Sequence, residues 1–279
     1  MEQPTIALLT DFGLRDAYVG VMKAVMRRIC SGAALIDLTH AIEPQAVREA
    51  ALTLLSAYAY FPAGTIFLVV VDPGVGTTRR PVAVAAGDYQ FVAPDNGVLS
   101  YVLELLPDVR SVELTQDTYR LHPTSQTFHG RDIFAPAAAH LAAGVSLPEL
   151  GPTLHDLMRL PAPRLDIVDG CLLGEIVHID HFGNVVTSIG TLTWTAEDVL
   201  QLQPQFGPSR DVRTIDAAHA VVACGDQEVA GIFRAYGQAA RGQMLTLVGS
   251  SGFLELAINQ GNGAAALNIA IGDPVELRV

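Results

Sequence analysis

The sequence predicts an α/β N-terminal domain with a mostly parallel central sheet, followed by a smaller all-β, barrel-like C-terminal domain. In the first half of the chain, short apolar runs alternate with segments in which apolar residues recur at helical spacing. In the second half, the apolar runs are short, turn residues separate them, and no long amphipathic helix is evident. The length of 279 residues is sufficient for two domains that each bury a core.

Strand and helix patterns follow one another regularly in the first half. The apolar run at residues 6–9 ends in the tetrapeptide TDFG, and the apolar stripe over 18–29 then indicates a helix. The unit recurs with a run at 35–38 and a stripe over 47–58, for which Pro44 suits the first helical turn. Further strands are expected at 66–71, 82–86, 91–93 and 109–114, and a further helix at 133–143. The first of these strands is continuously apolar, which is typical of a strand covered on both faces.

A proline-rich stretch separates the two patterns. Prolines recur at positions 148, 152, 161 and 163 with little periodicity between them, which is typical of a linker. We therefore expect a linker region over residues 148–169, an α/β domain over 1–160 and a β-barrel-like domain over 170–279. The strands expected in the second domain are residues 171–179, 185–189, 244–248, 253–258 and 274–279.

The composition excludes several classes of protein. Hydrophobic residues make up 50% of the chain and charged residues 16%, which excludes a disordered chain and a coiled coil. The 17 basic and 29 acidic residues give a formal net charge of −12, so nucleic acid is not an expected partner. The sole lysine, Lys23, has no glycine-rich approach, which argues against a P-loop and against Schiff-base chemistry.

The cysteines and the apolar runs indicate the cellular compartment in which we expect the protein. Cys30, Cys171 and Cys224 are widely spaced and form no CxxC, so we expect neither a disulfide framework nor a thiolate zinc site. No apolar run approaches the length needed to span a bilayer, and the N-terminal residues lack the basic region of a signal peptide. We therefore expect a cytoplasmic protein without a membrane partner.

Three acidic residues follow expected strands of the first domain: Asp11 in TDFG, Asp72 in VVVDPGVG and Asp95 in VAPDNG. Because ligands bind beyond the carboxyl ends of strands in open parallel sheets, these carboxylates together indicate a polar pocket. Each one alone is also explained as a turn residue, since Asp before Gly, Pro or Asn often bonds its own backbone.

Two more residues are candidates for the same pocket. Arg79 lies seven residues after Asp72, across a loop with two glycines, and could fold back to hold the aspartate ionised. The alternative is a surface arginine, for which the adjacent Arg80 is the obvious candidate. His129 directly precedes Gly130, and histidine is the side chain most easily poised near neutral pH. The alternative for His129 is a structural, hydrogen-bonded role.

In the second domain, polar turns at residues 180–184 (DHFGN) and 249–252 (GSSG) interrupt strand runs. Each is explained as a hairpin turn, or its side chains could read the edge of a base, because an amide presents donor and acceptor together. His178, Asp180 and His181 could mimic a metal cluster, but strand alternation would direct the histidines to opposite sides, so no metal is predicted. The common nucleotide-binding, zinc-protease and serine-hydrolase signatures are absent.

Six motifs in order make the chain similar to the S-adenosyl-L-methionine (SAM) hydrolase (adenosine-forming) family, namely TDFG, VVVDPGVGTTR, VAPDNG, TFHGRD, IDHFGNVVTSI and GSSGFLELA. This family is also described as SAM hydroxide adenosyltransferase and is related to fluorinase and chlorinase. The resemblance covers nearly the whole chain. It implies an α/β domain, a β-barrel domain and a homotrimer, with active sites where the N-terminal domain of one subunit meets the C-terminal domain of its neighbour.

The resemblance also implies roles for individual residues. Asp72, Arg79 and His129 match the family's catalytic set, from which the halogenating relatives depart, so water is expected as the nucleophile rather than halide. The residues that match substrate-binding positions are Asp11 on the ribose, Asp180 and Asn184 in the barrel turn with Asn184 on the adenine, and Ser250, Ser251 and Glu255. By the same resemblance, Ser251 occupies a position at which the halogenases carry an arginine. This difference leaves open which residues contact the methionine end of the substrate.

The expected reaction is hydrolysis of SAM to adenosine and L-methionine by attack of water or hydroxide at C5′. Because the sulfonium makes methionine a good leaving group, no metal, other cofactor or covalent intermediate is expected. Asp72, held by Arg79, would orient the water, and His129 would accept or relay its proton; the sequence leaves open which of the two is the proximal base. The alternatives are a halide-dependent adenosyltransferase that forms 5′-halo-5′-deoxyadenosine, and a non-catalytic adenosine- or SAM-binding module.

Overall fold

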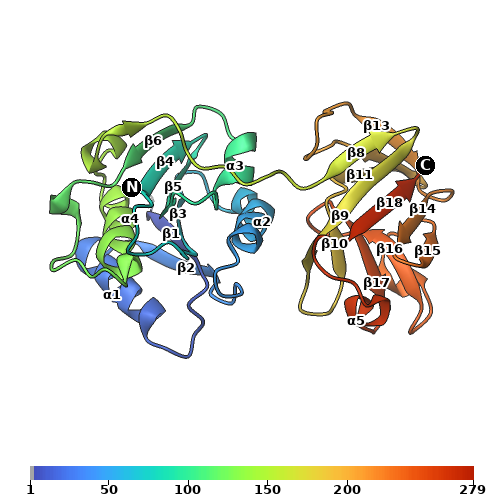
Figure 1. Cartoon of the computed structure of the whole chain (residues 1–279), viewed down its shortest axis with the longest axis horizontal. Coiled ribbons are helices and arrows are strands. Elements are labelled where there is room, and N and C mark those ends of the chain that lie inside the picture. The colour runs from blue at the N-terminus through green and yellow to red at the C-terminus, as the bar shows by residue number, and fades with distance from the viewer. Residues whose placement is uncertain (1–2) are drawn as a thin grey trace. The chain divides into compact units, whose positions relative to one another are not determined.

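The computed structural model describes residues 3–279, and the chain divides into two compact units between Leu160 and Pro161 (Figure 1). Each unit has its own sheets and its own buried side chains. The N-terminal unit combines a sheet with helices, and the C-terminal unit consists mainly of strands. The coarse prediction of an α/β unit followed by a barrel-like β unit is therefore confirmed.

The N-terminal unit contains one seven-stranded sheet in the order β2-β1-β3-β5-β4-β6-β7. Its strands are β1 (Thr5–Thr10), β2 (Ala34–Thr39), β3 (Ile66–Val70), β4 (Pro81–Ala86), β5 (Tyr89–Pro94), β6 (Arg110–Glu113) and β7 (Thr153–Leu154). β2, β1, β3 and β5 run parallel, whereas β4, β6 and β7 pair antiparallel. The sheet is therefore mixed rather than mostly parallel, because the two-residue turn between β4 and β5 is far too short for a parallel crossover.

Helices cover both faces of this sheet (Figure 1). They are α1 (Tyr18–Ile29), α2 (Val47–Ala57), α3 (Ser100–Leu105) and α4 (Ala135–Ala142), with the short helices η1 (Tyr58–Tyr60), η2 (Asp117–Tyr119), η3 (Gly130–Phe134) and η4 (Leu147–Leu150). Side chains alternate along β1, so Ile6 and Leu8 pack with α1 and α4 while Ala7 and Leu9 pack with α2 and α3. Pro44 precedes α2 rather than opening it.

The C-terminal unit is built on an eight-stranded antiparallel sheet in the order β15-β14-β18-β9-β10-β17-β16, with β8 paired to β9. The strands are β8 (Leu165–Val168), β9 (Cys171–Ile179), β10 (Val185–Thr187), β14 (Val221–Cys224), β15 (Gln227–Ala230), β16 (Met244–Val248), β17 (Leu254–Ile258) and β18 (Pro274–Arg278). A bridge between Phe233 and Leu247 brings the chain after β15 beside β16, so the sheet is nearly closed.

A separate three-stranded sheet of the same unit falls in a part of the sequence where no strand was expected. It consists of β11 (Leu192–Ala196), β12 (Val199–Leu202) and β13 (Arg213–Asp216). Two short helices, η5 (Tyr236–Gln238) and α5 (Gly263–Leu267), complete the unit, which is therefore mostly rather than entirely β. The stretch 148–169, expected as a linker, contains β7 and β8, which pair with β6 and β9.

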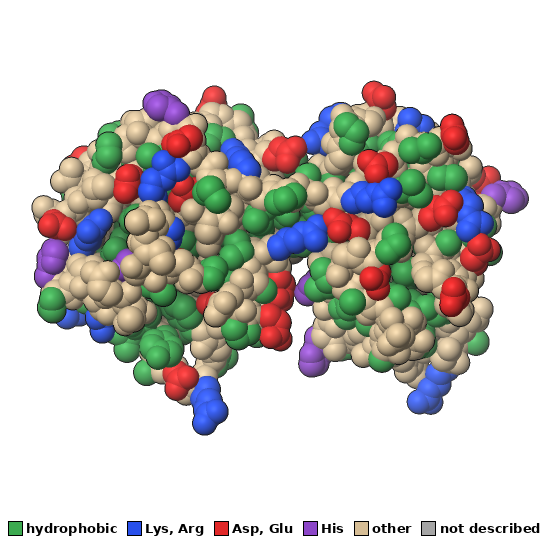
Figure 2. All heavy atoms as spheres, in the orientation of Figure 1, with side chains coloured by type: hydrophobic (Ala, Val, Ile, Leu, Met, Phe, Trp, Pro, Cys, Tyr) green, Lys and Arg blue, Asp and Glu red, His purple; other side chains and the backbone are tan. Residues whose placement is uncertain are grey.

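The surface carries both acidic and basic side chains. On the face shown in Figure 2, acidic and basic side chains are interspersed and no broad basic patch is present. Within residues 3–279, no helix combines the length and apolarity that crossing a bilayer requires. In the same residues, no three His, Cys, Asp or Glu side chains are grouped so that they could hold a metal ion.

Candidate active site

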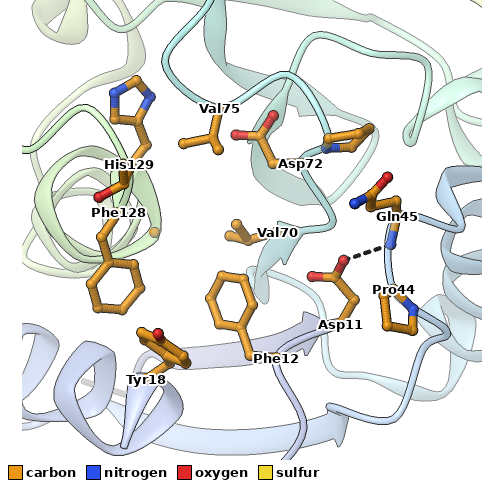
Figure 3. A pocket seen from close by; sticks show the side chains of 13 residues that line it. Asp11, Phe12, Tyr18, Pro44, Gln45, Val70, Asp72, Val75, Phe128 and His129 are labelled. Carbon is orange, nitrogen blue, oxygen red and sulfur yellow. Dashed lines mark hydrogen bonds between the residues drawn. The ribbon is translucent and has the colours of Figure 1, made fainter. Parts of the chain in front are cut away.

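A pocket of about 410 Å³ lies beyond the carboxyl ends of β1 and β3 in the N-terminal unit (Figure 3). Its lining comes from the loops after these strands, from the loop before α2 and from the segment that leads into η3. The lining residues are Asp11, Phe12, Tyr18, Pro44, Gln45, Val70, Asp72, Pro73, Val75, Thr127, Phe128, His129 and Gly130. Three sequence-predicted residues, Asp11, Asp72 and His129, thus share one pocket.

Asp72 is held by Arg79, as the loop spacing suggested. Arg79 Nε donates to both carboxylate oxygens at 2.9 and 3.0 Å, and Nη2 makes a further short contact to Oδ2. The two side chains are only 5% and 9% exposed, so this pair is shielded from screening by solvent. The intervening loop needs its glycine at position 76, where φ is 75° and a Cβ would lie 2.5 Å from the Gln126 carbonyl oxygen.

His129 joins the pair through the same guanidinium. Arg79 Nη2 donates to His129 Nδ1 at 2.9 Å, which places the proton of the neutral imidazole on Nε2. Burial, together with the positive charge of Arg79, lowers the pKa of His129 below its ordinary value of 6.5. Asp72, Arg79 and His129 therefore form one cluster in which the imidazole is held neutral.

Asp11 lies across the pocket from His129, as Figure 3 shows. The backbone N–H of Gln45 donates to Asp11 Oδ2 at 2.8 Å. Gln45 has a φ of 69°, a left-handed conformation that directs its N–H toward the aspartate loop. One carboxylate oxygen is thereby fixed, and the other is free to bind hydroxyl groups in the pocket.

An aromatic wall, which the sequence reasoning missed, closes one side of the pocket. The rings of Phe12, Tyr18 and Phe128 pack edge to face or tilted, with centroids 5.1 to 6.0 Å apart. Phe12 and Phe128 belong to the motifs TDFG and TFHGRD, whose polar residues Asp11 and His129 were the predicted site residues. A signal was present in the sequence, because Phe12 directly follows Asp11 and Phe128 directly precedes His129.

Asp95 and Arg80 lie outside this pocket. Arg80 Nε donates to Asp95 Oδ2 at 2.9 Å, and Nη1 donates to Asp156 Oδ1 at the same distance. The remaining Asp95 oxygen accepts the Met158 N–H at 2.8 Å. Asp95 therefore anchors the segment before the second unit, and its expected place in a polar pocket with Asp11 and Asp72 is wrong.

In the C-terminal unit, the turn between β9 and β10 carries a second polar cluster. Asp180 accepts from the Asn184 backbone and from Asn184 Nδ2, each at 2.8 Å. Asn184 Nδ2 also donates to the Tyr236 hydroxyl at 3.2 Å, and that hydroxyl donates to Glu255 Oε2 at 3.2 Å. Tyr236 is the residue missed by sequence reasoning here, since nothing in its local sequence distinguishes it.

The charges in this second cluster are perturbed by burial. Burial and the neighbouring Glu255 raise the pKa of Tyr236 to about 12, so the hydroxyl keeps its proton. Burial also raises the pKa of Glu255, against the hydrogen bond from Tyr236. Asp180, Asn184 and Tyr236 line a pocket of about 460 Å³.

Ser250 and Ser251 lie in the turn between β16 and β17, and neither lines this pocket. Ser250 is exposed and Ser251 is half-buried. The turn nevertheless borders Glu255, because a Cβ on Gly249 would lie 1.7 Å from Glu255 Oε1. Two groups of sequence-predicted residues therefore exist, one in each unit.

Comparison with known proteins agrees with these motifs. Residues 6–151 match the SAM hydroxide adenosyltransferase N-terminal domain, and residues 174–276 match the corresponding C-terminal domain. A protein of Thermus thermophilus named (R)-S-adenosyl-L-methionine hydrolase is 38% identical, with 98% of each chain covered. A fluorinase of Nocardia brasiliensis is 28% identical, over 99% of this chain and 97% of its own.

A solved structure is also similar over the whole chain. An uncharacterised conserved protein from Thermotoga maritima is 37% identical and superposes with a TM-score of 0.86, covering 98% of this chain and 100% of its own. The family match extends through both units, and the motif residues of each unit fall within the matched ranges. The chain belongs to the SAM hydroxide adenosyltransferase family.

Proposed function

We propose that this protein hydrolyses S-adenosyl-L-methionine to adenosine and L-methionine, with water or hydroxide attacking C5′. The observation that carries the proposal is the Arg79 guanidinium, which bonds both Asp72 and His129 beside a pocket that Asp11 also lines. The Thermus relative named (R)-S-adenosyl-L-methionine hydrolase supports the substrate and indicates the R epimer at sulfur.

The chemistry requires positioning more than activation of the substrate. A C5′–O bond forms as the C5′–S bond breaks, the electron pair of the C5′–S bond goes to sulfur, and methionine leaves with its sulfur as a neutral thioether. One proton is lost from the attacking water. Holding water and C5′ in line can supply roughly 7–11 kcal/mol of the barrier, and a positioned base adds about 10²–10⁴-fold.

The hydrogen-bond pattern favours Asp72 as the proton acceptor. His129 Nδ1 is occupied by an Arg79 N–H and Nε2 already carries a proton, so the neutral imidazole has no free lone pair for a second proton. The Asp72 carboxylate retains lone pairs beside the pocket, and Arg79 keeps it oriented. We assign to His129 the role of donating from Nε2 to the oxygen of the attacking water.

Asp11 and the aromatic wall, which also line the pocket, are available to bind the rest of the substrate. We assign Asp11 to the ribose hydroxyls, since its free oxygen can accept from them while Gln45 holds the other. The aromatic wall gives one side of the pocket an apolar lining, against which we place the apolar parts of the substrate.

For the adenine we propose the polar cluster of the barrel unit, with Asp180, Asn184, Ser250, Ser251 and Glu255 as substrate-binding residues. Both Asn184 Nδ2 protons are used by Asp180 and Tyr236. Its Oδ1 is then the atom left to accept a hydrogen bond from an exocyclic amino group, such as that of adenine.

We further propose a cytoplasmic homotrimer in which the N-terminal unit of one subunit and the C-terminal unit of its neighbour complete each site. The resemblance to the family supports this assembly, and three unpaired cysteines, Cys30, Cys171 and Cys224, suit a reducing compartment. We propose neither a nucleic-acid nor a membrane partner, and no metal or organic cofactor.

The test is incubation of purified protein with each sulfur epimer of SAM, followed by chromatography of the products. Formation of adenosine and methionine in equal amounts, unchanged by a chelator, is the expected result. S-adenosylhomocysteine would identify a methyltransferase instead, and chloride-dependent 5′-chloro-5′-deoxyadenosine would identify a halogenase. Intact SAM recovered in complex with the protein after long incubation would identify a binding module.

A further inference from the structure

A chain of polar side chains lies directly behind the Asp11 loop, and none of its members lines the pocket. Thr10 Oγ1 lies 2.8 Å from His40 Nδ1, and His40 Nε2 lies 3.0 Å from Asp37 Oδ1. Lys23 Nζ donates to Asp37 Oδ2 at 2.6 Å. Thr10 is 0% and His40 is 4% exposed, so the chain runs from the surface of α1 into the interior.

The direction of the hydrogen bond between Thr10 and His40 follows from the proton that the Thr10 hydroxyl has to donate. Thr10 Oγ1 accepts the Phe12 N–H at 3.2 Å, so its own hydroxyl proton is available for His40 Nδ1. With Nδ1 accepting from Thr10, a proton on Nε2 faces Asp37 Oδ1 at 3.0 Å. Burial raises the pKa of Asp37, but hydrogen bonds from Lys23 and His40 outweigh this and lower it, so the carboxylate stays charged.

The same residues hold the backbone that carries Asp11. Phe12 N–H is bound by the Thr10 hydroxyl, and Gly13 N–H donates to the His40 carbonyl oxygen at 2.8 Å. Gln45, on the same loop as His40, binds the Asp11 side chain itself. Asp11 is thus fixed from both sides by the segment between β2 and α2, with Thr10 and His40 as its buried anchor.

We propose that Thr10 and His40 are positioning residues, which hold Asp11 in the orientation that binds the substrate's ribose hydroxyls. The inference rests on the proposed function and adds residues that act on substrate affinity through Asp11. The order hydroxyl, imidazole, carboxylate resembles a nucleophilic triad, but Thr10 is completely buried and does not line the pocket. Positioning is the role that this geometry permits.

The test compares Thr10→Val, which removes the hydroxyl at nearly constant volume, with Thr10→Ser, which keeps it. Because ribose binding precedes and persists through the reaction, misplacing Asp11 should raise KM by about tenfold while kcat changes less than about threefold. Thr10→Ser, which keeps the hydroxyl, should have a KM within about threefold of the wild type. Unfolding midpoints of both variants are measured alongside the kinetics.

A second pair covers the case in which Thr10→Val does not fold. His40→Asn places an acceptor near the Nδ1 position and keeps the bond from Thr10, whereas His40→Gln reaches only the Nε2 position. The expected order of KM is wild type, then His40→Asn, then His40→Gln. Equal KM values for the two variants would overturn the proposal.

A double-mutant cycle with Asp11→Asn shows whether the effect passes through Asp11. The roughly tenfold effect of Thr10→Val on KM should shrink to less than about twofold in the Asp11→Asn background, because the anchored group no longer contributes. An undiminished effect there, or a wild-type KM in Thr10→Val alone, would overturn the inference. A wild-type protein that forms no adenosine would instead refute the proposed function.

Discussion

At the residue scale, two adjacent arginines are given different tasks by the fold. Arg79 bonds Asp72 and His129, whereas Arg80 bonds Asp95 and Asp156. They are the two residues directly before β4, and their side chains bind different partners. The sequence left open whether one arginine could substitute for the other, and the distances show that Arg79 alone contacts the pocket cluster.

This difference supplies a matched pair of variants. Arg79→Lys should lower kcat by about 10²-fold or more, because an ammonium cannot bond the carboxylate and the imidazole in the same geometry. Arg80→Lys should keep kcat within about threefold, since Arg80 is outside the pocket. Both are measured by adenosine release under saturating SAM. Equal losses in the two variants would contradict the assignment of Arg79.

The lowered pKa of His129 predicts how stability depends on pH. Between the folded-state pKa and the ordinary value of 6.5, the unfolded chain binds a proton that the folded chain does not, so stability falls as the pH drops through this window. In His129→Gln this part of the fall should disappear, while the part from His140, whose pKa burial also lowers, remains. Thermal unfolding of the wild type and of His129→Gln, each at about pH 7.5 and about pH 5.5, measures the contributions of His129 and His140 to this fall.

At the element scale, η3 begins immediately after His129 and runs directly into α4. Its buried residue Asp132 is 0% exposed, accepts the Ser125 N–H at 2.8 Å and pairs with Arg131. The loop that delivers His129 to the pocket is therefore fastened at Ser125 and at η3.

Asp132→Asn should lower the free energy of unfolding by about 2–4 kcal/mol, because Arg131 loses its charged partner and the Ser125 N–H loses a carboxylate acceptor. The matched control is Asp117→Asn, whose side chain is 77% exposed and should change stability by less than about 0.5 kcal/mol. Urea unfolding measures both. A cost for Asp132→Asn no larger than that of the control would show that this fastening contributes little.

At the scale of the whole molecule, the two groups of predicted residues lie in different units of the chain. Asp72 and His129 belong to the N-terminal unit, and Asn184 and Glu255 to the C-terminal unit. If sites form between neighbouring subunits, an Asp72→Asn chain and an Asn184→Ala chain can complement each other.

Each variant alone should be inactive. Co-expressed in equal amounts, the two variants should recover about a quarter of the wild-type activity. In random assembly, about one site in four combines an intact N-terminal unit with an intact C-terminal unit of the neighbouring subunit. The mass in solution should be three times the 29.6 kDa of the chain. Mixed oligomers without activity would place each site within a single subunit.

The sequence by itself determined the features that depend on neighbouring residues. Apolar runs located most strands, helical spacing located α1 and α2, and the motifs supplied the family and the residues Asp72, Arg79 and His129. Strand direction was misjudged where the β4–β5 turn produced antiparallel pairs, although its shortness was visible in the sequence. The strands of the three-stranded sheet were missed because their apolar runs are brief and interrupted.

Only the tertiary structure decided which polar groups meet. The bonds from Arg79 to His129 and from Gln45 to Asp11, and the link from Tyr236 to Glu255, join residues that are distant in the chain. So does the Thr10–His40 anchor behind Asp11. Local patterns reflect how each segment pairs its own backbone and buries its own apolar face, whereas these contacts exist only after separate segments have packed together.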